Sequence, residues 1–309
     1  MLLFFVSDSL HARLPDRIPY RKGNLWGFCD SAKKILIEPR WKDVGYFSGN
    51  AAKVSDGSDW ALIDTAGNLI TRMKYEWISD EAVNGTRTAS LWKYGKQGAI
   101  NDRGEVVVPF DYDWLIWSGT YLQGMKNDLT GFWNSEGKVV IPFIYNGRGD
   151  VPRSMGDSGL FVVREPTKKH HKPGLFGVID TAGNVIIPFV HDWINANECG
   201  SFQDWSWEKE RYTYYDTRGN VIDTTGPCPK PDQYYDKGHF SYGFAPYRFD
   251  TLEGYVNEKH EIVIQPVYCS AGSFGPDGLA RVSYFDPVCG RCKYWEGVID
   301  IRGTQYWEN

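Results

Sequence analysis

One short pattern recurs along this chain and constrains its fold more than any other feature. It consists of a Gly, two residues, an Asp or Asn, two residues, a second Gly and an aliphatic run, as in "FGVIDTAGNVIIPF" at 176–189. We call the Asp or Asn the turn residue. The eight turn residues, spaced 33 to 46 residues apart, are Asp30, Asp64, Asn101, Asn134, Asp180, Asp216, Asn257 and Asp300. Self-similarity at such a period indicates a repeat architecture.

The glycines of the pattern predict a β-hairpin in each copy. Gly stands three residues before the turn residue in six copies, with Ala61 and Thr213 in the others, and three residues after it in six copies, with Lys33 and His260 in the others. Asp or Asn at the start of a turn accepts hydrogen bonds from the backbone two residues on. Gly at the fourth turn position adopts the positive φ that closes a type I turn with a bulge. We therefore expect hairpin turns at 30–33, 64–67, 101–104, 134–137, 180–183, 216–219, 257–260 and 300–303.

A ring and a further strand complete the unit. Eleven residues after the turn residue stands an aromatic or His side chain in six copies, namely Trp41, Tyr75, Tyr112, Tyr145, His191 and Tyr268. Proline often ends the aliphatic run, which places that strand at a sheet edge or a bulge. A third strand signal, such as "GLARV" at 278–282, recurs between hairpins. Each unit is predicted to hold about three antiparallel strands.

The pattern resembles the bacterial WG-repeat family, also called KWG repeats. "LWGFCDSAKKILIEPRW" and "LFGVIDTAGNVIIPFVHDW" carry it most fully, and the resemblance extends from about Leu25 to Trp307. It implies an all-β repeat array used mainly for binding, with no shared catalytic residues to carry over.

We expect a single all-β domain, 1–309, of about eight repeats. An N-terminal cap at 1–24, with "LLFFV" as a strand covering the first unit's edge, precedes the repeats. Their boundaries are about 25–58, 59–93, 94–128, 129–173, 174–210, 211–251 and 252–293, with a partial repeat at 294–309. Uneven spacing and three strands per unit favour an open, elongated, solenoid-like array, with a closed β-propeller as the alternative.

Composition excludes several classes of function. With 34 basic and 39 acidic residues, the net charge of −5 gives no general attraction to nucleic acid or to anionic membranes. No apolar run reaches the length of a membrane span, and the N-terminus lacks the features of a signal peptide. We therefore expect a cytoplasmic protein, monomeric in isolation, whose six cysteines are reduced thiols.

Two clusters that could carry chemistry are assigned to loops. Cys289 and Cys292 have the spacing of half a zinc site, but no second such pair exists, so we predict a tight loop and no metal. The basic segment at 164–174 is predicted to be a solvated loop. No cofactor-binding or nucleophile motif occurs, so we expect no enzyme; a glycosidase would need two carboxyls facing each other across a cleft.

Tryptophans outside the repeat positions are the candidate binding residues. Trp205 and Trp207 lie in an insertion with Asp204 and Glu208, and Trp114 and Trp117 lie in "DWLIWSG". Aromatic residues that the framework does not require are typical interface anchors, and the acids of the insertion suit a basic partner. We predict a protein-binding surface, of the kind that a bacterial immunity protein uses to neutralise a toxin. Carbohydrate or cell-wall binding is the alternative, because aromatic faces also stack on sugars.

Overall fold

The computed structural model describes most of the chain, and the statements below concern that part. The described ranges are 14–80, 82–92, 95–147, 153–154, 158–165, 174–197, 201–206, 211–222, 240–249, 252–285 and 294–308. Regular structure in these ranges is β-strand, without an α-helix, so the predicted all-β class is confirmed. No helix there is long and apolar enough to cross a membrane.

The eight turn residues all form the same hairpin turn. In each copy the turn residue's C=O accepts from the N–H three residues on, and its N–H donates to the C=O four residues on. Its side-chain Oδ1 also accepts from the N–H groups two and four residues on. The residue at the fourth turn position has positive φ in every copy, including Lys33 at 63° and His260 at 60°. The hairpin predictions are thus confirmed.

A second side-chain pair strengthens five of these turns. Where the turn residue is Asp, the residue four positions on is Asn in three copies, and its amide donates to the free carboxylate oxygen. Where the turn residue is Asn101 or Asn257, the residue four positions on is Glu105 or Glu261, and donor and acceptor are exchanged. In these five copies the two positions are therefore chemically complementary, because one supplies an amide and the other a carboxylate.

The early Gly of the pattern allows the outer strand to bulge against it. Phe28 lies opposite Ile37 and Trp26 lies opposite Trp41, so the outer strand holds two extra residues between these pairs. A Cβ on Gly27 would lie 2.2 Å from the carbonyl oxygen of Ile37. After the bulge, the ring residue pairs with the residue four positions before the turn residue, as His191 does with Phe176.

The described strands form eight small sheets, which we number along the chain. Sheet 1 holds β1 (Ile18–Lys22), β2 (Leu25–Cys29), β3 (Ile35–Trp41) and β29 (Trp307–Glu308). Sheet 2 holds β4 (Asp43–Val44), β5 (Ala52–Ser55) and β6 (Trp60–Ile63); sheet 3 holds β7 (Trp77–Ile78), β8 (Thr86–Ser90), β9 (Gln97–Asn101) and β10 (Val106–Tyr112). Sheet 4 holds β11 (Trp114–Ser118), β12 (Tyr121–Lys126), β13 (Leu129–Trp133) and β14 (Val139–Asn146).

The remaining sheets follow the same order. Sheet 5 holds β15 (Arg153–Ser154), β16 (Leu160–Arg164), β17 (Phe176–Asp180) and β18 (Val185–His191). Sheet 6 holds β19 (Ile194–Asn197), β20 (Ser201–Ser206), β21 (Arg211–Tyr215) and β22 (Val221–Ile222). Sheet 7 holds β23 (Phe244–Phe249), β24 (Leu252–Asn257) and β25 (Ile262–Tyr268), and sheet 8 holds β26 (Ser270–Ala271), β27 (Leu279–Phe285) and β28 (Tyr294–Asp300).

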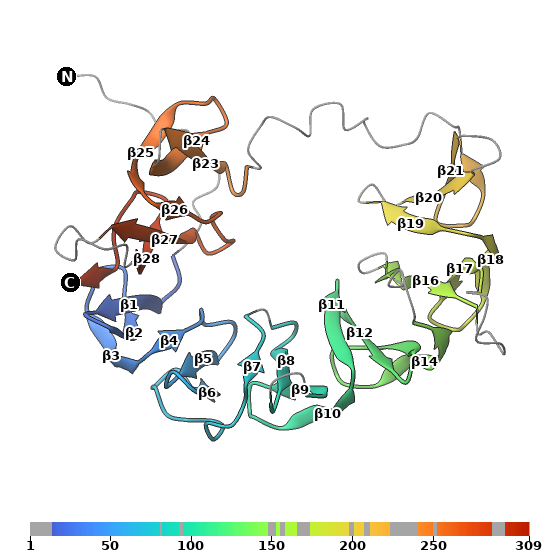
Figure 1. Ribbon diagram of the computed structural model, residues 1–309, viewed down its shortest axis with the longest axis horizontal. Coiled ribbons are helices and arrows are strands. Elements are labelled where there is room, and N and C mark those ends of the chain that lie inside the picture. The colour runs from blue at the N-terminus through green and yellow to red at the C-terminus, as the bar shows by residue number, and fades with distance from the viewer. Residues whose placement is uncertain are drawn as a thin grey trace.

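The sheets follow one another around a ring-like arc (Figure 1). The short strands β4, β7, β11, β19 and β26 lie toward the inside of the arc, and β3, β10, β14 and β18 lie toward the outside. Sheet 8 contacts sheet 1, since Leu279 and Val298 share a buried cluster with Ile18 and Phe28. The sheets therefore curve as in the propeller alternative and do not extend in a straight line.

The two ends of the described chain meet in sheet 1. β29 pairs with β1 in parallel, with Arg21 opposite Trp307 and Lys22 opposite Glu308. It fills the edge of β1 that the N-terminal "LLFFV" segment was expected to cover, and that segment lies outside the described residues. The pairing satisfies backbone groups that an open edge would leave exposed.

Replacing Gly183 by Val should lower the free energy of unfolding by about 1–3 kcal/mol, because a β-branched residue is strained at positive φ. Gly183 has φ 83°, and a Cβ there would meet no heavy atom within 4 Å, so the loss would report backbone strain alone. Urea denaturation measures it. His260→Gly, at a position that already has positive φ, should be neutral or stabilising. Unchanged stability of Gly183→Val would contradict the assignment.

The turn carboxylates should make stability fall in acid. Hydrogen bonds from the Asn184 side chain and backbone lower the pKa of Asp180, and equivalent bonds lower the pKa of Asp64 and Asp216. Their contribution is fully present above the unfolded pKa of about 3.9 and is lost as pH falls through the lower folded values. Asp64→Asn/Asp180→Asn/Asp216→Asn keeps the Oδ1 acceptors and removes these titrations. Its unfolding free energy, measured by urea denaturation from about pH 7 to about pH 3, should decline less than that of the unmodified chain; parallel profiles would contradict this.

Candidate ligand-binding groove

The residue type at one position of the inner strands varies from copy to copy. Thirteen residues after the turn residue, at what we call the inner position, stand Trp77, Trp114 and Trp193, whereas other copies have Asp43, Gly147 or Ser270. The turn, glycine and ring positions keep their chemistry from copy to copy, but this one does not. Tryptophan at the inner position is therefore not required for folding.

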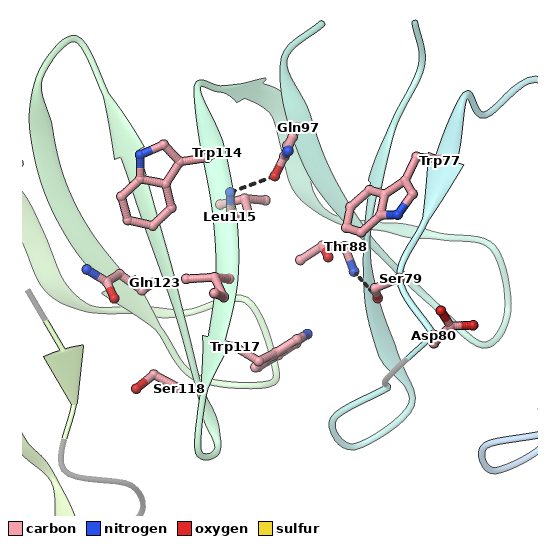
Figure 2. A pocket seen from close by; sticks show the side chains of 11 residues that line it. Trp77, Ser79, Asp80, Thr88, Gln97, Trp114, Leu115, Trp117, Ser118 and Gln123 are labelled. Atoms are coloured by element: carbon pink, nitrogen blue, oxygen red, sulfur yellow. Dashed lines mark hydrogen bonds between the residues drawn. The ribbon is translucent and has the colours of Figure 1, made fainter. Parts of the chain in front are cut away.

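A groove of about 920 Å³ lies between sheets 3 and 4, and two such tryptophans, Trp77 and Trp114, line it. Trp77 reaches into it from β7, and Trp117 reaches into it from β11 (Figure 2). Trp77 is 40% exposed and Ile116 is 55% exposed. The complete lining is Trp77, Ser79, Asp80, Thr88, Gln97, Trp114, Leu115, Ile116, Trp117, Ser118 and Gln123.

Polar groups in the walls of the groove are engaged with the fold. The Gln97 side-chain oxygen accepts from the Leu115 N–H at 2.7 Å, and the Ser79 hydroxyl accepts from the Thr88 N–H at 3.2 Å. The Gln123 amide donates to the Thr130 hydroxyl at 3.4 Å. The surface left for a ligand is therefore mainly aromatic and aliphatic.

Trp117 joins the groove to the core of sheet 4. Its ring packs against the buried cluster that contains Leu115, Leu122 and Trp133, and its indole N–H is buried with no hydrogen-bond partner among the described residues. Gly124 permits the close packing of this sheet, because a Cβ there would lie 2.6 Å from a methyl carbon of Leu115. A buried donor without a partner costs free energy, which a bound acceptor would recover.

The inner strands are sheet edges, and side chains cap their backbone groups. We call the residue 14 positions after the turn residue the edge residue. Gln97 caps the N–H of edge residue Leu115, and Glu253, at the equivalent position of another copy, caps the N–H of edge residue Ala271 at 2.7 Å. Asp43 caps the N–H of edge residue Val44. Capped edges are protected from unspecific strand pairing.

The predicted partner-binding residues lie in two different places in the structure. Trp114 and Trp117 line the groove together. Asp204 lies in sheet 6, where its carboxylate is 15% exposed and 3.0 Å from Nδ1 of the ring residue His191. This carboxylate therefore has an internal partner in His191. The backbone of Trp205 pairs with Tyr212 in the same sheet, and Trp207 and Glu208 lie outside the described residues.

Sequence reasoning missed Trp77. Its signal is the shared inner position, 13 residues after Asp64, which matches the distance from Asn101 to Trp114. Aligning the copies beyond the ring residue groups these two tryptophans from the sequence alone.

The predicted cysteine and basic loops lie largely outside the described residues. These are Cys289, Cys292 and most of 164–174. Within the described ranges, no group of three or more His, Cys, Asp or Glu side chains could hold a metal ion. Cys29 is a buried free thiol whose pKa burial raises to about 12, so it is a packing residue.

Comparison with solved structures supports a β-propeller-like repeat protein. A structure titled "Crystal structure of the eukaryotic initiation factor" matches with a TM-score of 0.53 and 11% identity over 94% of each chain, and the structural neighbours are β-propeller-like folds. Kluyveromyces lactis Hsv2p matches at 0.34 and 15% identity over 67% of this chain and 79% of its own. A streptogramin B lyase matches with a TM-score of 0.31 and 11% identity over 87% of this chain and 91% of its own. At these identities the likeness shows the fold alone.

Sequence comparison gives the family. A family model described as the WG containing repeat matches residues 26–58, 98–117, 176–202 and 254–284. The chain carries WG repeats in these four regions, and the WG repeat is not known as a catalytic family. The comparison with curated protein sequences gives no match.

Replacing Gln97 by Ala should lower the free energy of unfolding by about 1–3 kcal/mol, because the Leu115 N–H loses its partner at a buried edge. Gln97→Glu keeps the acceptor, as Glu253 does in another copy, and should retain most of the stability. Thermal and urea denaturation of both variants measure the difference. Equal losses in the two variants would show that the cap does not matter.

Proposed function

We propose that this chain is a non-catalytic binding module that holds a partner protein in the groove between sheets 3 and 4. The observation that carries the proposal is the exposure of Trp77 and Ile116 in the groove that Trp114 and Trp117 also line. The strands that carry these residues, β7 and β11, lie toward the inside of the arc. Exposed aromatic and aliphatic side chains that the fold does not require are typical of an interface core. The repeats supply a rigid support, and binding needs no reactive group.

A protein partner fits the groove better than a carbohydrate does. Sugar recognition combines aromatic stacking with several convergent hydrogen-bonding groups, but the amide and hydroxyl acceptors here already hold backbone N–H groups. An apolar or amphipathic side chain of a protein needs fewer such groups. Carbohydrate binding is the competing hypothesis, and a glycan array tests it directly.

Within protein binding, the specific role that we propose is that of a bacterial immunity protein acting in the cytoplasm. Such a protein neutralises a toxin by occupying its surface, so affinity alone is sufficient. The WG-repeat matches support a repeat module. A secreted toxin encoded beside this gene would be the first candidate partner to test.

The groove variant Trp77→Ala/Ile116→Ala should weaken binding of the partner by about 2 kcal/mol or more, roughly thirtyfold in Kd. Its melting temperature should change little, because both side chains are substantially exposed. The measurement is calorimetric titration of the candidate toxin, with thermal melts in parallel. Val190→Ala, which truncates a 65% exposed side chain on the outer strand β18, is the matched control and should retain full affinity.

A second double variant separates the two surfaces expected from the sequence. Trp205→Ala/Trp207→Ala should retain affinity if the groove is the site. If this variant loses binding and the groove variant does not, the site belongs to the insertion of sheet 6 and the proposal fails. Binding to a glycan that the groove variant abolishes, without binding to any protein, would also overturn it.

A further inference from the structure

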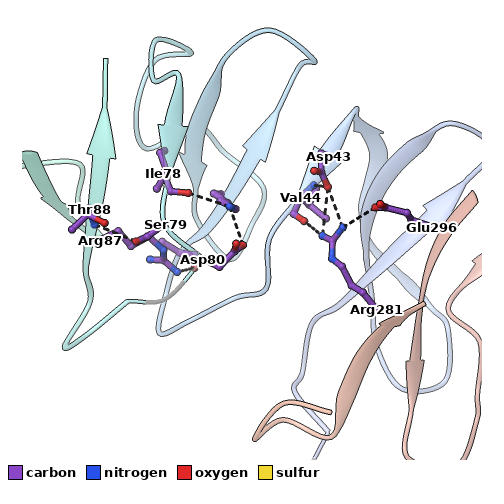
Figure 3. Close-up of polar contacts among 11 residues, drawn as sticks. Asp43, Val44, Ile78, Ser79, Asp80, Arg87, Thr88, Arg281 and Glu296 are labelled. Carbon is purple, nitrogen blue, oxygen red and sulfur yellow. Dashed lines mark hydrogen bonds and ion pairs between the residues drawn. The ribbon is translucent and has the colours of Figure 1, made fainter. Parts of the chain in front are cut away.

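At two other places in the arc, a basic side chain of one sheet contacts the inner edge strand of another sheet. Lys53 of β5 donates to the C=O of edge residue Ile78 at 3.1 Å, pairs with Asp80 at 2.9 Å and lies 4.5 Å from the centre of the Trp60 ring. Figure 3 shows the bonds at Ile78 and Asp80. The side chain of Lys53 is only 10% exposed. A carbonyl, a carboxylate and an aromatic face together stabilise its buried ammonium group.

Arg281 of β27 makes the same three kinds of contact at another interface. It donates to the C=O of edge residue Val44, pairs with Asp43 at 3.4 Å and lies 5.2 Å from the centre of the Trp26 ring (Figure 3). The molecule therefore uses one recognition mode twice: a cation between an edge carbonyl, a carboxylate and a tryptophan.

The groove is the equivalent place without the cation. Lys53 and Arg281 each lie opposite the residue two positions before a turn residue, and at this position sheet 3 has Thr88, opposite Ala99. The equivalent edge residue is Leu115, and both Thr88 and Leu115 line the groove. Thr is too short to reach across as Lys and Arg do, so the interface between sheets 3 and 4 is left open.

The other parts of the recognition mode are present. In an antiparallel strand the N–H and C=O of one residue point to the same edge, so the Leu115 C=O lies on the side where Gln97 caps the Leu115 N–H. Asp80, which also pairs with Lys53, lines the groove with a carboxylate that is 69% exposed, and Trp77 and Trp117 offer aromatic faces. A carbonyl, a carboxylate and a tryptophan therefore border the groove as they border Lys53 and Arg281.

We infer that the groove receives a Lys or Arg side chain of the partner protein, in the place that Lys53 and Arg281 occupy within the ring. This inference rests on the proposed function, since it names the chemistry of the partner at the same site. The cation would donate to the Leu115 carbonyl, pair with Asp80 and lie against a tryptophan ring. A basic partner also suits the net charge of −5.

The test supplies the cation from within the chain. Thr88→Lys should fill the groove by recreating the contact of Lys53, and Thr88→Val is the matched control that adds no charge and little volume. The probes are Nα-acetyl-lysinamide and its uncharged analogue Nα-acetyl-norleucinamide, titrated while tryptophan fluorescence is recorded. The unmodified chain and Thr88→Val should bind the lysine probe at least about tenfold more tightly than the norleucine probe, a difference of about 1.4 kcal/mol. Thr88→Lys should lose this preference.

Each outcome decides the inference. Equal binding of the two probes, no binding of either, or an unchanged preference in Thr88→Lys would overturn it. If Thr88→Lys does not fold, Asp80→Asn decides, because it should weaken the lysine probe and leave the norleucine probe unchanged; unchanged norleucine binding shows that loss of the Lys53 pair has not altered the groove. The proposed function is judged separately, since the groove variant Trp77→Ala/Ile116→Ala can still abolish partner binding when the lysine preference is absent.

Discussion

The whole ring depends on one local interaction, the turn oxygen that accepts two backbone N–H groups. It is present in all eight copies and fixes where each pair of strands reverses. Because the turn sets the register of the hairpin, it also places the early Gly against the bulge of the outer strand and the ring residue opposite its partner. One short side chain thus organises a whole repeat unit.

That local regularity explains how much of the fold could be predicted. Turn position, positive φ at Lys33 and His260, and the pairing of ring residues all follow from the chemistry of one hairpin and its turn. The curvature of the array does not, because it depends on how neighbouring sheets pack. The sequence did not predict β29 either, because this strand is only two residues long and pairs with β1, which is far away in the sequence.

The site was predictable in part for the same reason. Trp114 and Trp117 stood out as aromatic residues beyond the framework, but their neighbour Trp77 comes from another copy and is recognised only when the copies are aligned at the inner position. The groove itself could not be predicted, because it lies where Thr88 stands at the position that Lys53 and Arg281 hold in two other sheets. Its recognition requires knowing what fills the equivalent space elsewhere, and only the contacts of Lys53 and Arg281 show that.

The parallel pairing of β29 with β1 has a consequence for the order of folding. β1 is synthesised before every other described strand, and β29 is synthesised after all of them. Sheet 1 therefore cannot be completed until β29 has emerged, although the later sheets have all their strands close together in sequence and can form as they emerge. Until β29 docks, the edge of β1 stays open, and a chaperone or a second nascent chain could occupy it.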